Sequence, residues 1–75
     1  MGLNKRILFS THAVVRARQR RIFPDMVKAS IDGGRIERFG CNQIRFVKDY
    51  RKGKVVCIGV EEKECIIIKT IEWKH

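Results

Sequence analysis

Long apolar runs, proline, cysteine and acidic side chains are all scarce in this sequence of 75 residues. No run approaches the ~20 apolar residues that a membrane-spanning helix requires. A single proline and a hydrophobic fraction of 44% indicate a folded chain, because disordered segments are poor in apolar residues. At this length we expect one domain with a small core, spanning residues 1–75.

The cysteines are too few and too scattered for a disulfide framework or a zinc site. Their number is odd, and Cys41, Cys57 and Cys65 form no C-x-x-C pair. We therefore expect free thiols in a reducing compartment, and no metal or other cofactor. Residues 1–6 are polar and the next apolar stretch, Ile7–Phe9, is three residues long, which does not resemble a secretion signal. These features predict a cytoplasmic protein.

Acidic side chains are outnumbered, with 8 Asp and Glu against 17 Lys and Arg, for a net charge of +9. A net positive charge of this size creates an electrostatic field that concentrates polyanions, of which nucleic acid is the commonest. Simple solubility and attraction to an acidic protein are the alternatives. Residues 1–40 hold nine basic and three acidic side chains, so an anion site is expected mainly in the first half of the chain.

The hydrophobic pattern changes its period at Gly34, which predicts an α+β fold. Before this glycine we expect a strand over 7–9, a helix over 11–20 capped by Ser10 or Thr11, and a helix from Pro24 to Gly33. After it, β-branched and aromatic runs predict strands over 35–39, 43–49, 54–61 and 64–73. The short turns predict two N-terminal helices on one face of a four- to five-stranded twisted antiparallel sheet.

One strand of this sheet has an unusual pattern, because Ile66, Ile67 and Ile68 make it apolar on both faces. A central strand has this character, and so does an edge strand covered by another chain. Both interpretations stay open at this point.

The first helix carries a row of cationic side chains. At about 100° per residue, His12, Arg16 and Arg20 lie within about 80° of one another, at the margin of the strip that can face a sheet. Cations at this spacing repel one another, which is tolerable if an anion bridges them. Arginine suits phosphate, and histidine can transfer protons near neutral pH.

This row has three interpretations. It can cleave phosphodiesters without a metal, with the imidazole moving protons and the guanidinium groups holding negative charge. It can also bind an anion without catalysis, or be a solvated helix face. The eight acidic residues show no cluster that resembles a metal cage, so metal-dependent cleavage is less favoured.

Further candidates lie in the strand region. Arg45 points away from its neighbours Ile44 and Phe46, either toward an anion or toward an acidic residue on the next strand. The hairpin tip with Arg51 and Lys52 suits contact with a phosphate backbone. Trp73 can stack on a base or anchor the core.

Several of these positions together resemble a known bacterial family. The residues are Thr11-His12-Ala13, then Arg16, then Arg20 with Ile22, followed by the strands 44–47 and 68–73. Over roughly residues 7–73 they resemble the domain-of-unknown-function family 4258, which looks like a compact relative of the RelE-like toxins.

The resemblance implies a metal-independent endoribonuclease, the toxin of a toxin–antitoxin pair, acting on free or ribosome-bound RNA. A cognate antitoxin protein is the implied partner. The implied site residues are His12, Arg16, Arg20, Arg45 and Thr70. A non-catalytic RNA- or DNA-binding module and a basic protein-interaction domain are the alternatives.

The sequence departs from the family at one position, where Arg21 stands in place of the usual glycine. Glycine there lets a helix end in the left-handed conformation. Arg21 either adopts that conformation at about 1 kcal/mol or makes the helix end differently.

Overall fold

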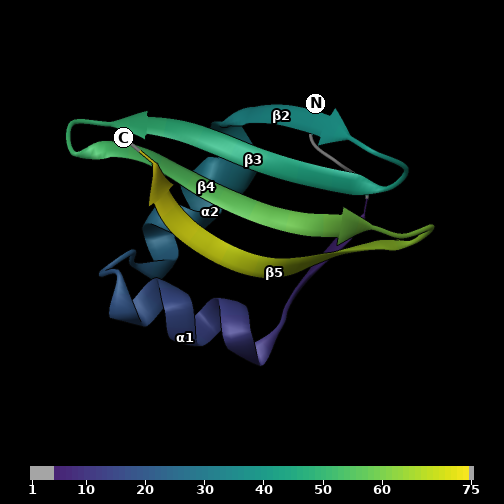
Figure 1. Ribbon diagram of the computed structural model, residues 1–75, viewed down its shortest axis with the longest axis horizontal. Coiled ribbons are helices and arrows are strands. Elements are labelled where there is room, and N and C mark those ends of the chain that lie inside the picture. Colours follow the sequence, from purple (N-terminus) through teal and green to yellow (C-terminus); the bar gives the residue numbers. More distant parts are fainter. Residues whose placement is uncertain (1–4, 75) are drawn as a thin grey trace.

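The computed structural model describes residues 5–74, which form two helices and five strands (Figure 1). In chain order these are β1 (Arg6–Phe9), α1 (Thr11–Gln19), α2 (Pro24–Gly33), β2 (Arg35–Phe39), β3 (Gln43–Tyr50), β4 (Gly53–Glu61) and β5 (Cys65–Lys74). Most of the polar opening segment, residues 1–4, lies outside the described residues. Within residues 5–74 no helix is long and apolar enough to cross a membrane.

The five strands form one mixed sheet in the order β1-β5-β4-β3-β2. Strands β2 to β5 make the expected antiparallel meander, but β1 pairs with β5 in parallel. The prediction of a wholly antiparallel sheet was therefore wrong for this pair. The helical layer follows β1 directly, so β1 is not joined to the meander by a hairpin and is free to run in the same direction as β5.

The pairing of β1 explains the strand that is apolar on both faces. Ile66 and Ile68 lie on the part of β5 that is flanked by β1 on one side and β4 on the other. This confirms a central position for this part of β5. Beyond Ile68 there is no β1 residue in the register, and the edge of β5 is next to α1 (Figure 1).

The core lies between the two helices and one face of the sheet. Phe46, Cys57, Ile66 and Ile68 are fully buried there, together with Ala13 of α1. The cysteines are free thiols, as expected. Burial raises the pKa of the Cys57 thiol to about 12, so this side chain acts as a small apolar group and not as a nucleophile.

The starts of both helices are specified locally. Ser10 is the N-cap of α1, and its Oγ accepts a hydrogen bond from the Ala13 amide at 3.1 Å. The same hydroxyl donates to the Lys69 carbonyl of β5 at 3.3 Å, which ties the cap to the sheet. Pro24 opens α2 with Asp25 in its first turn, as the sequence indicates.

Helix α1 ends in the left-handed conformation although no glycine is present. Arg21 has φ 56°, the Arg21 amide donates to the Arg18 carbonyl at 3.1 Å, and the Ile22 amide donates to the Ala17 carbonyl at 2.9 Å. This pair of bonds is the Schellman motif, in which glycine is usual at the position of Arg21. The first of the two alternatives for Arg21 is therefore confirmed.

Replacing Arg21 with glycine is expected to stabilise the fold by about 1 kcal/mol, because glycine adopts positive φ without steric strain. Thermal unfolding should show a midpoint about 4–8 °C higher. Arg21→Ala is the matched control, since it removes the same charge and keeps the strain. Equal midpoints for the two variants would show that charge, not backbone conformation, sets the stability at this position.

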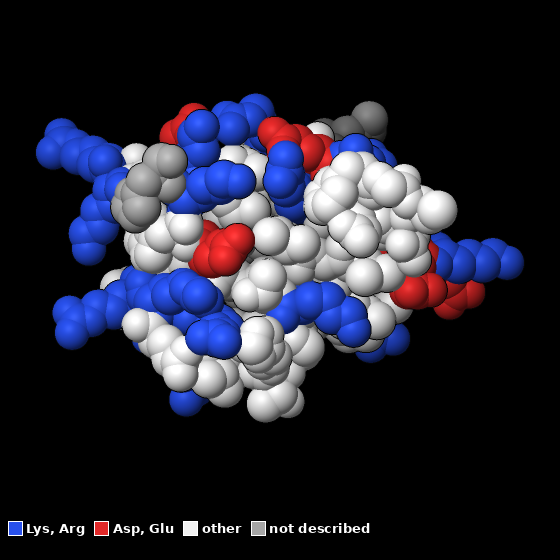
Figure 2. Space-filling view, viewed as in Figure 1, with Lys and Arg blue, Asp and Glu red and all other residues white. Residues whose placement is uncertain are grey.

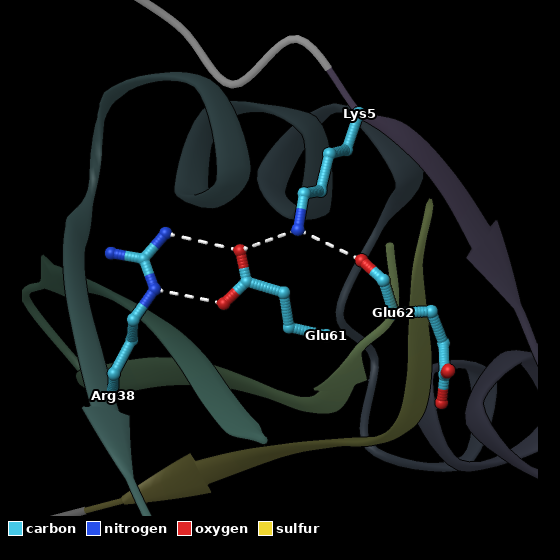
Figure 3. Close-up of polar contacts among 4 residues, drawn as sticks. All are labelled: Lys5, Arg38, Glu61 and Glu62. Atoms are coloured by element: carbon cyan, nitrogen blue, oxygen red, sulfur yellow. Dashed lines mark hydrogen bonds and ion pairs between the residues drawn. The ribbon is translucent and has the colours of Figure 1, made fainter. Parts of the chain in front are cut away.

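Glu61 connects the two outer parts of the sheet at one end (Figure 3). Its carboxylate accepts bonds from Arg38 of β2 at 2.8 and 3.2 Å and from Lys5, just before β1, at 3.0 Å. Lys5 also donates to the Glu62 carbonyl at 2.8 Å. Hydrogen bonds from Arg38 and then from Lys5 lower the pKa of Glu61 to about 2, so the carboxylate is charged at neutral pH.

Candidate functional site

The first two members of the α1 row contact each other. His12 is exposed and Arg16 is half-buried, and the Arg16 Nε donates to His12 Nε2 at 3.3 Å. Arg16 Nη1 also donates to the Gln19 Oε1 at 3.4 Å. The bond to Nε2 requires a neutral imidazole whose proton is on Nδ1. An exposed proton acceptor therefore lies directly beside a guanidinium group.

The third member of the row is held against the sheet. Arg20 Nη1 donates to the Ile71 carbonyl of β5 at 3.3 Å, and the Arg20 carbonyl accepts from Trp73 Nε1 at 2.8 Å. Arg20 thus joins the end of α1 to the edge of β5. Trp73 packs against the core and lies edge-on to Tyr50, with ring centroids 6.4 Å apart. The interpretation of Trp73 as a core anchor is confirmed.

Arg45 lies on the face of the sheet opposite the helices, which we call the open face. Its Nε donates to the Glu37 carboxylate at 2.6 Å, and its guanidinium lies 5.1 Å from the centre of the Phe39 ring. Both partners belong to β2, so the side chain extends away from β5 and α1. Of the two sequence interpretations, pairing with an acidic residue is the one that the structure shows.

Thr70 shares the open face with Arg45. Arg45, Ile58 and Thr70 form one row across β3, β4 and β5, so their side chains point to the same side. The two outer members are two strands apart, or about 10 Å. The structure therefore brings His12 and Arg16 together and fixes Arg20 nearby on α1, but it does not bring Arg45 to them.

Basic side chains gather at one end of the open face. Figure 2 shows Lys and Arg over the β3–β4 hairpin and along the border of α1 and β5, whereas the region over the β2–β3 turn is mainly white. Arg51 and Lys52 are exposed at the hairpin tip, as the sequence predicts. We use the term basic surface for Arg16, Arg20, Arg51, Lys52, Lys54 and Lys74.

The sequence places Lys54 beside the basic hairpin tip, but sequence reasoning missed its pairing with Lys74, which is exposed and directly opposite Lys54 on β5. Like charges in this arrangement are destabilising, and a bound anion would remove that repulsion. Asp49 is the other neighbour of Lys54 in the register, but its carboxylate bonds Arg35 at 3.2 Å. The strand register was the signal needed to find this pair.

The described residues, 5–74, contain no group of three His, Cys, Asp or Glu side chains arranged to hold a metal ion. No family model, curated protein or solved structure matches this chain.

Proposed function

We propose that the chain is a small endoribonuclease that binds RNA along the basic surface and cleaves it without a metal, with a RelE-like fold and the toxin role that this resemblance implies. A cognate antitoxin would hold it inactive. The observation that carries the proposal is the contact between His12 and Arg16, an exposed imidazole beside a guanidinium on a strongly basic face.

The chemistry follows from the two atoms in contact. RNA phosphate is a stronger partner for Arg16 than a neutral imidazole is, so a bound phosphate would draw the guanidinium away and free His12 Nε2. The imidazole then takes the proton of a 2′-hydroxyl, whose oxygen attacks the adjacent phosphorus. The bond from phosphorus to the 5′-oxygen breaks, that oxygen takes up a proton from water, and a 2′,3′-cyclic phosphate remains. Arg16 offsets the charge that develops on the phosphoryl oxygens.

A non-catalytic RNA- or DNA-binding module is the second candidate, and the position of Arg45 favours it. This arginine belongs to the site that the resemblance implies, yet it is bonded to Glu37 and extends away from α1. Without Arg45, the cationic side chain that the structure places in contact with His12 is Arg16 of the same helix. A basic protein-interaction domain is the third candidate.

Cleavage separates the first candidate from the other two. Purified protein is incubated with an unstructured RNA in EDTA, and the products are analysed for cyclic phosphate ends. We expect cleavage with these ends. If the protein binds RNA without cutting it, whether the RNA is free in solution or bound to ribosomes, the function is that of a binding module. If it neither binds nor cuts RNA at physiological salt, the interaction domain is the remaining candidate.

Binding through the basic surface is expected to weaken steeply with salt. Each phosphate contact contributes about 0.7 to the slope of log affinity against log salt for single strands. The double variant Lys54→Gln/Lys74→Gln should therefore lower the slope by about 1.4, measured by fluorescence anisotropy with a labelled RNA. Lys28→Gln/Lys63→Gln is the matched control, because it removes the same charge outside this surface. Equal slopes for the two double variants would place the RNA elsewhere.

A further inference from the structure

The two helices enclose an apolar groove on the other side of α1 from His12 and Arg16. It has a volume of about 580 Å³, within the range of ligand-binding sites in proteins. Val14 and Ala17 of α1 form one wall, Val27 of α2 forms another, and Ile71 of β5 and Phe9 of β1 complete the lining.

Large apolar side chains at this groove are open to solvent. Phe9 is 43% exposed, Val14 is 42% exposed, and Phe23, in the link between the helices, is 60% exposed. All three line the groove, so their exposed surfaces gather at one place. A gathered apolar surface on an otherwise very basic chain indicates an interaction site, since scattered exposed apolar residues are ordinary but clustered ones are not.

The rim of the groove is cationic. Lys28 is bonded to Asp32 at 3.1 Å, so these two charges offset each other. Arg18 and Arg21 also line the groove, and neither takes part in an ion pair within residues 5–74. The rim therefore offers two arginines to an acidic partner.

The backbone of Arg21 supports a role for its side chain at the rim. The residue holds the left-handed conformation, which glycine would adopt at lower free energy. Residues kept in such conformations tend to lie at functional sites. An arginine at this position is explained if its guanidinium binds something that enters the groove.

We propose that the groove binds an amphipathic helix of a partner protein, with acidic residues along the borders of the helix's apolar stripe. Apolar side chains at positions i, i+3, i+4 and i+7 would enter the groove, as in other complexes of a helix with a groove. The acidic borders would meet Arg18 and Arg21. A second copy of this chain is a poor occupant, because it carries +9 and the same rim arginines.

This inference does not depend on RNA cleavage. The groove and the pair of His12 and Arg16 lie on different sides of α1, so a helix in the groove and RNA on the basic surface would have α1 between them. Loss of one binding activity can therefore be measured while the other is retained.

The test uses a fluorescein-labelled peptide of about 18 residues, or about five turns, with leucine at i, i+3, i+4 and i+7 and glutamate at the borders. Fluorescence anisotropy at about 0.15 M salt should show saturable binding with a dissociation constant in the micromolar range. A peptide with lysine borders and a peptide with serine in place of leucine are the controls. Each should bind at least about tenfold more weakly than the acidic peptide. The first lacks the negative charge that would meet the rim arginines, and the second lacks the apolar side chains that would enter the groove.

Two valines of α1 provide a matched pair of protein variants. Val14 lines the groove and is 42% exposed, whereas Val15 is 44% exposed and is not part of the lining. Val14→Glu should weaken binding of the acidic peptide at least about tenfold. Val15→Glu adds the same charge to the same helix and should change it by less than about twofold. Circular dichroism checks that both variants fold.

Several outcomes would overturn the proposal. The absence of saturable binding of the acidic peptide is one, and equal weakening by both valine variants is another. Displacement of the peptide by RNA would place it on the basic surface. Sedimentation that shows a dimer lost in Val14→Glu but not in Val15→Glu would assign the groove to a second copy. Binding of dodecanoate without binding of the peptide would assign it to a small amphiphile.

Discussion

Replacing His12 with alanine is expected to slow RNA cleavage about 10²- to 10⁴-fold, the usual contribution of a positioned acid or base. RNA affinity should change little, because the proposed phosphate contacts come from arginines and lysines that the substitution leaves in place. Single-turnover cleavage in EDTA gives the rate, and anisotropy with a labelled RNA gives the affinity. A fall in rate at constant affinity would assign proton transfer to His12.

Gln19 provides the control for this experiment. Its Oε1 accepts from Arg16 Nη1 at 3.4 Å, so Gln19→Ala disturbs the same arginine from the other side and leaves the imidazole intact. We expect its cleavage rate to stay within a few-fold of the unmodified chain. Equal cleavage by the chain and by His12→Ala would mean that another base, or a contaminating nuclease, is responsible. Similar losses in both variants would mean that the position of Arg16 is what matters.

Replacing Gly34 with alanine is expected to destabilise the fold by about 3 kcal/mol, the upper end of the usual range for overpacking. A Cβ atom at this position would overlap the Ser30 carbonyl of α2 and the Val47 carbonyl of β3. Both are backbone atoms, so relief requires α2 and β3 to move apart. The Gly34 amide also donates to the Ser30 carbonyl at 3.0 Å, and that bond would be strained by the same movement.

The neighbouring glycine makes the matched control. A Cβ atom on Gly33 would have no atom within 4 Å, and the residue is the last of α2. Gly33→Ala should therefore stabilise the fold by about 0.5 kcal/mol, because alanine lowers the conformational entropy of the unfolded chain. Thermal unfolding should place the two variants more than about 10 °C apart. Similar midpoints would show that α2 and β3 can separate without loss of packing.

Elements specified by neighbouring residues could be predicted from the sequence. Ser10 as a cap, Pro24 at a helix start and the two glycines at the end of α2 act within one turn, so their effect does not depend on the rest of the chain. The parallel pairing of Arg6–Phe9 with β5 could not be predicted, because it joins segments 59 residues apart. Nothing local in a four-residue strand sets its partner or direction.

In the candidate site too, contacts set by neighbouring residues could be predicted, and contacts between distant segments could not. The contact of His12 with Arg16 follows from helix spacing, whereas Lys54 and Lys74 become neighbours only through the register of two strands. The partner of Arg45 is Glu37, which the sequence leaves open because any acidic residue on a neighbouring strand would serve. The groove beside Val14 depends on how α1 and α2 lie on the sheet, which no single helix pattern specifies.

The position of β5 in the sheet determines when α1 can pack during synthesis of the chain. Strand β5 follows the other described elements in the chain but lies inside the sheet, and it provides the edges to which β1 and β4 bond and the carbonyls that Ser10 and Arg20 contact. While a nascent chain still lacks residues 65–74, α1 has no β5 edge to pack against. The surface that includes His12 and Arg16 therefore takes its final place only after β5 has been synthesised.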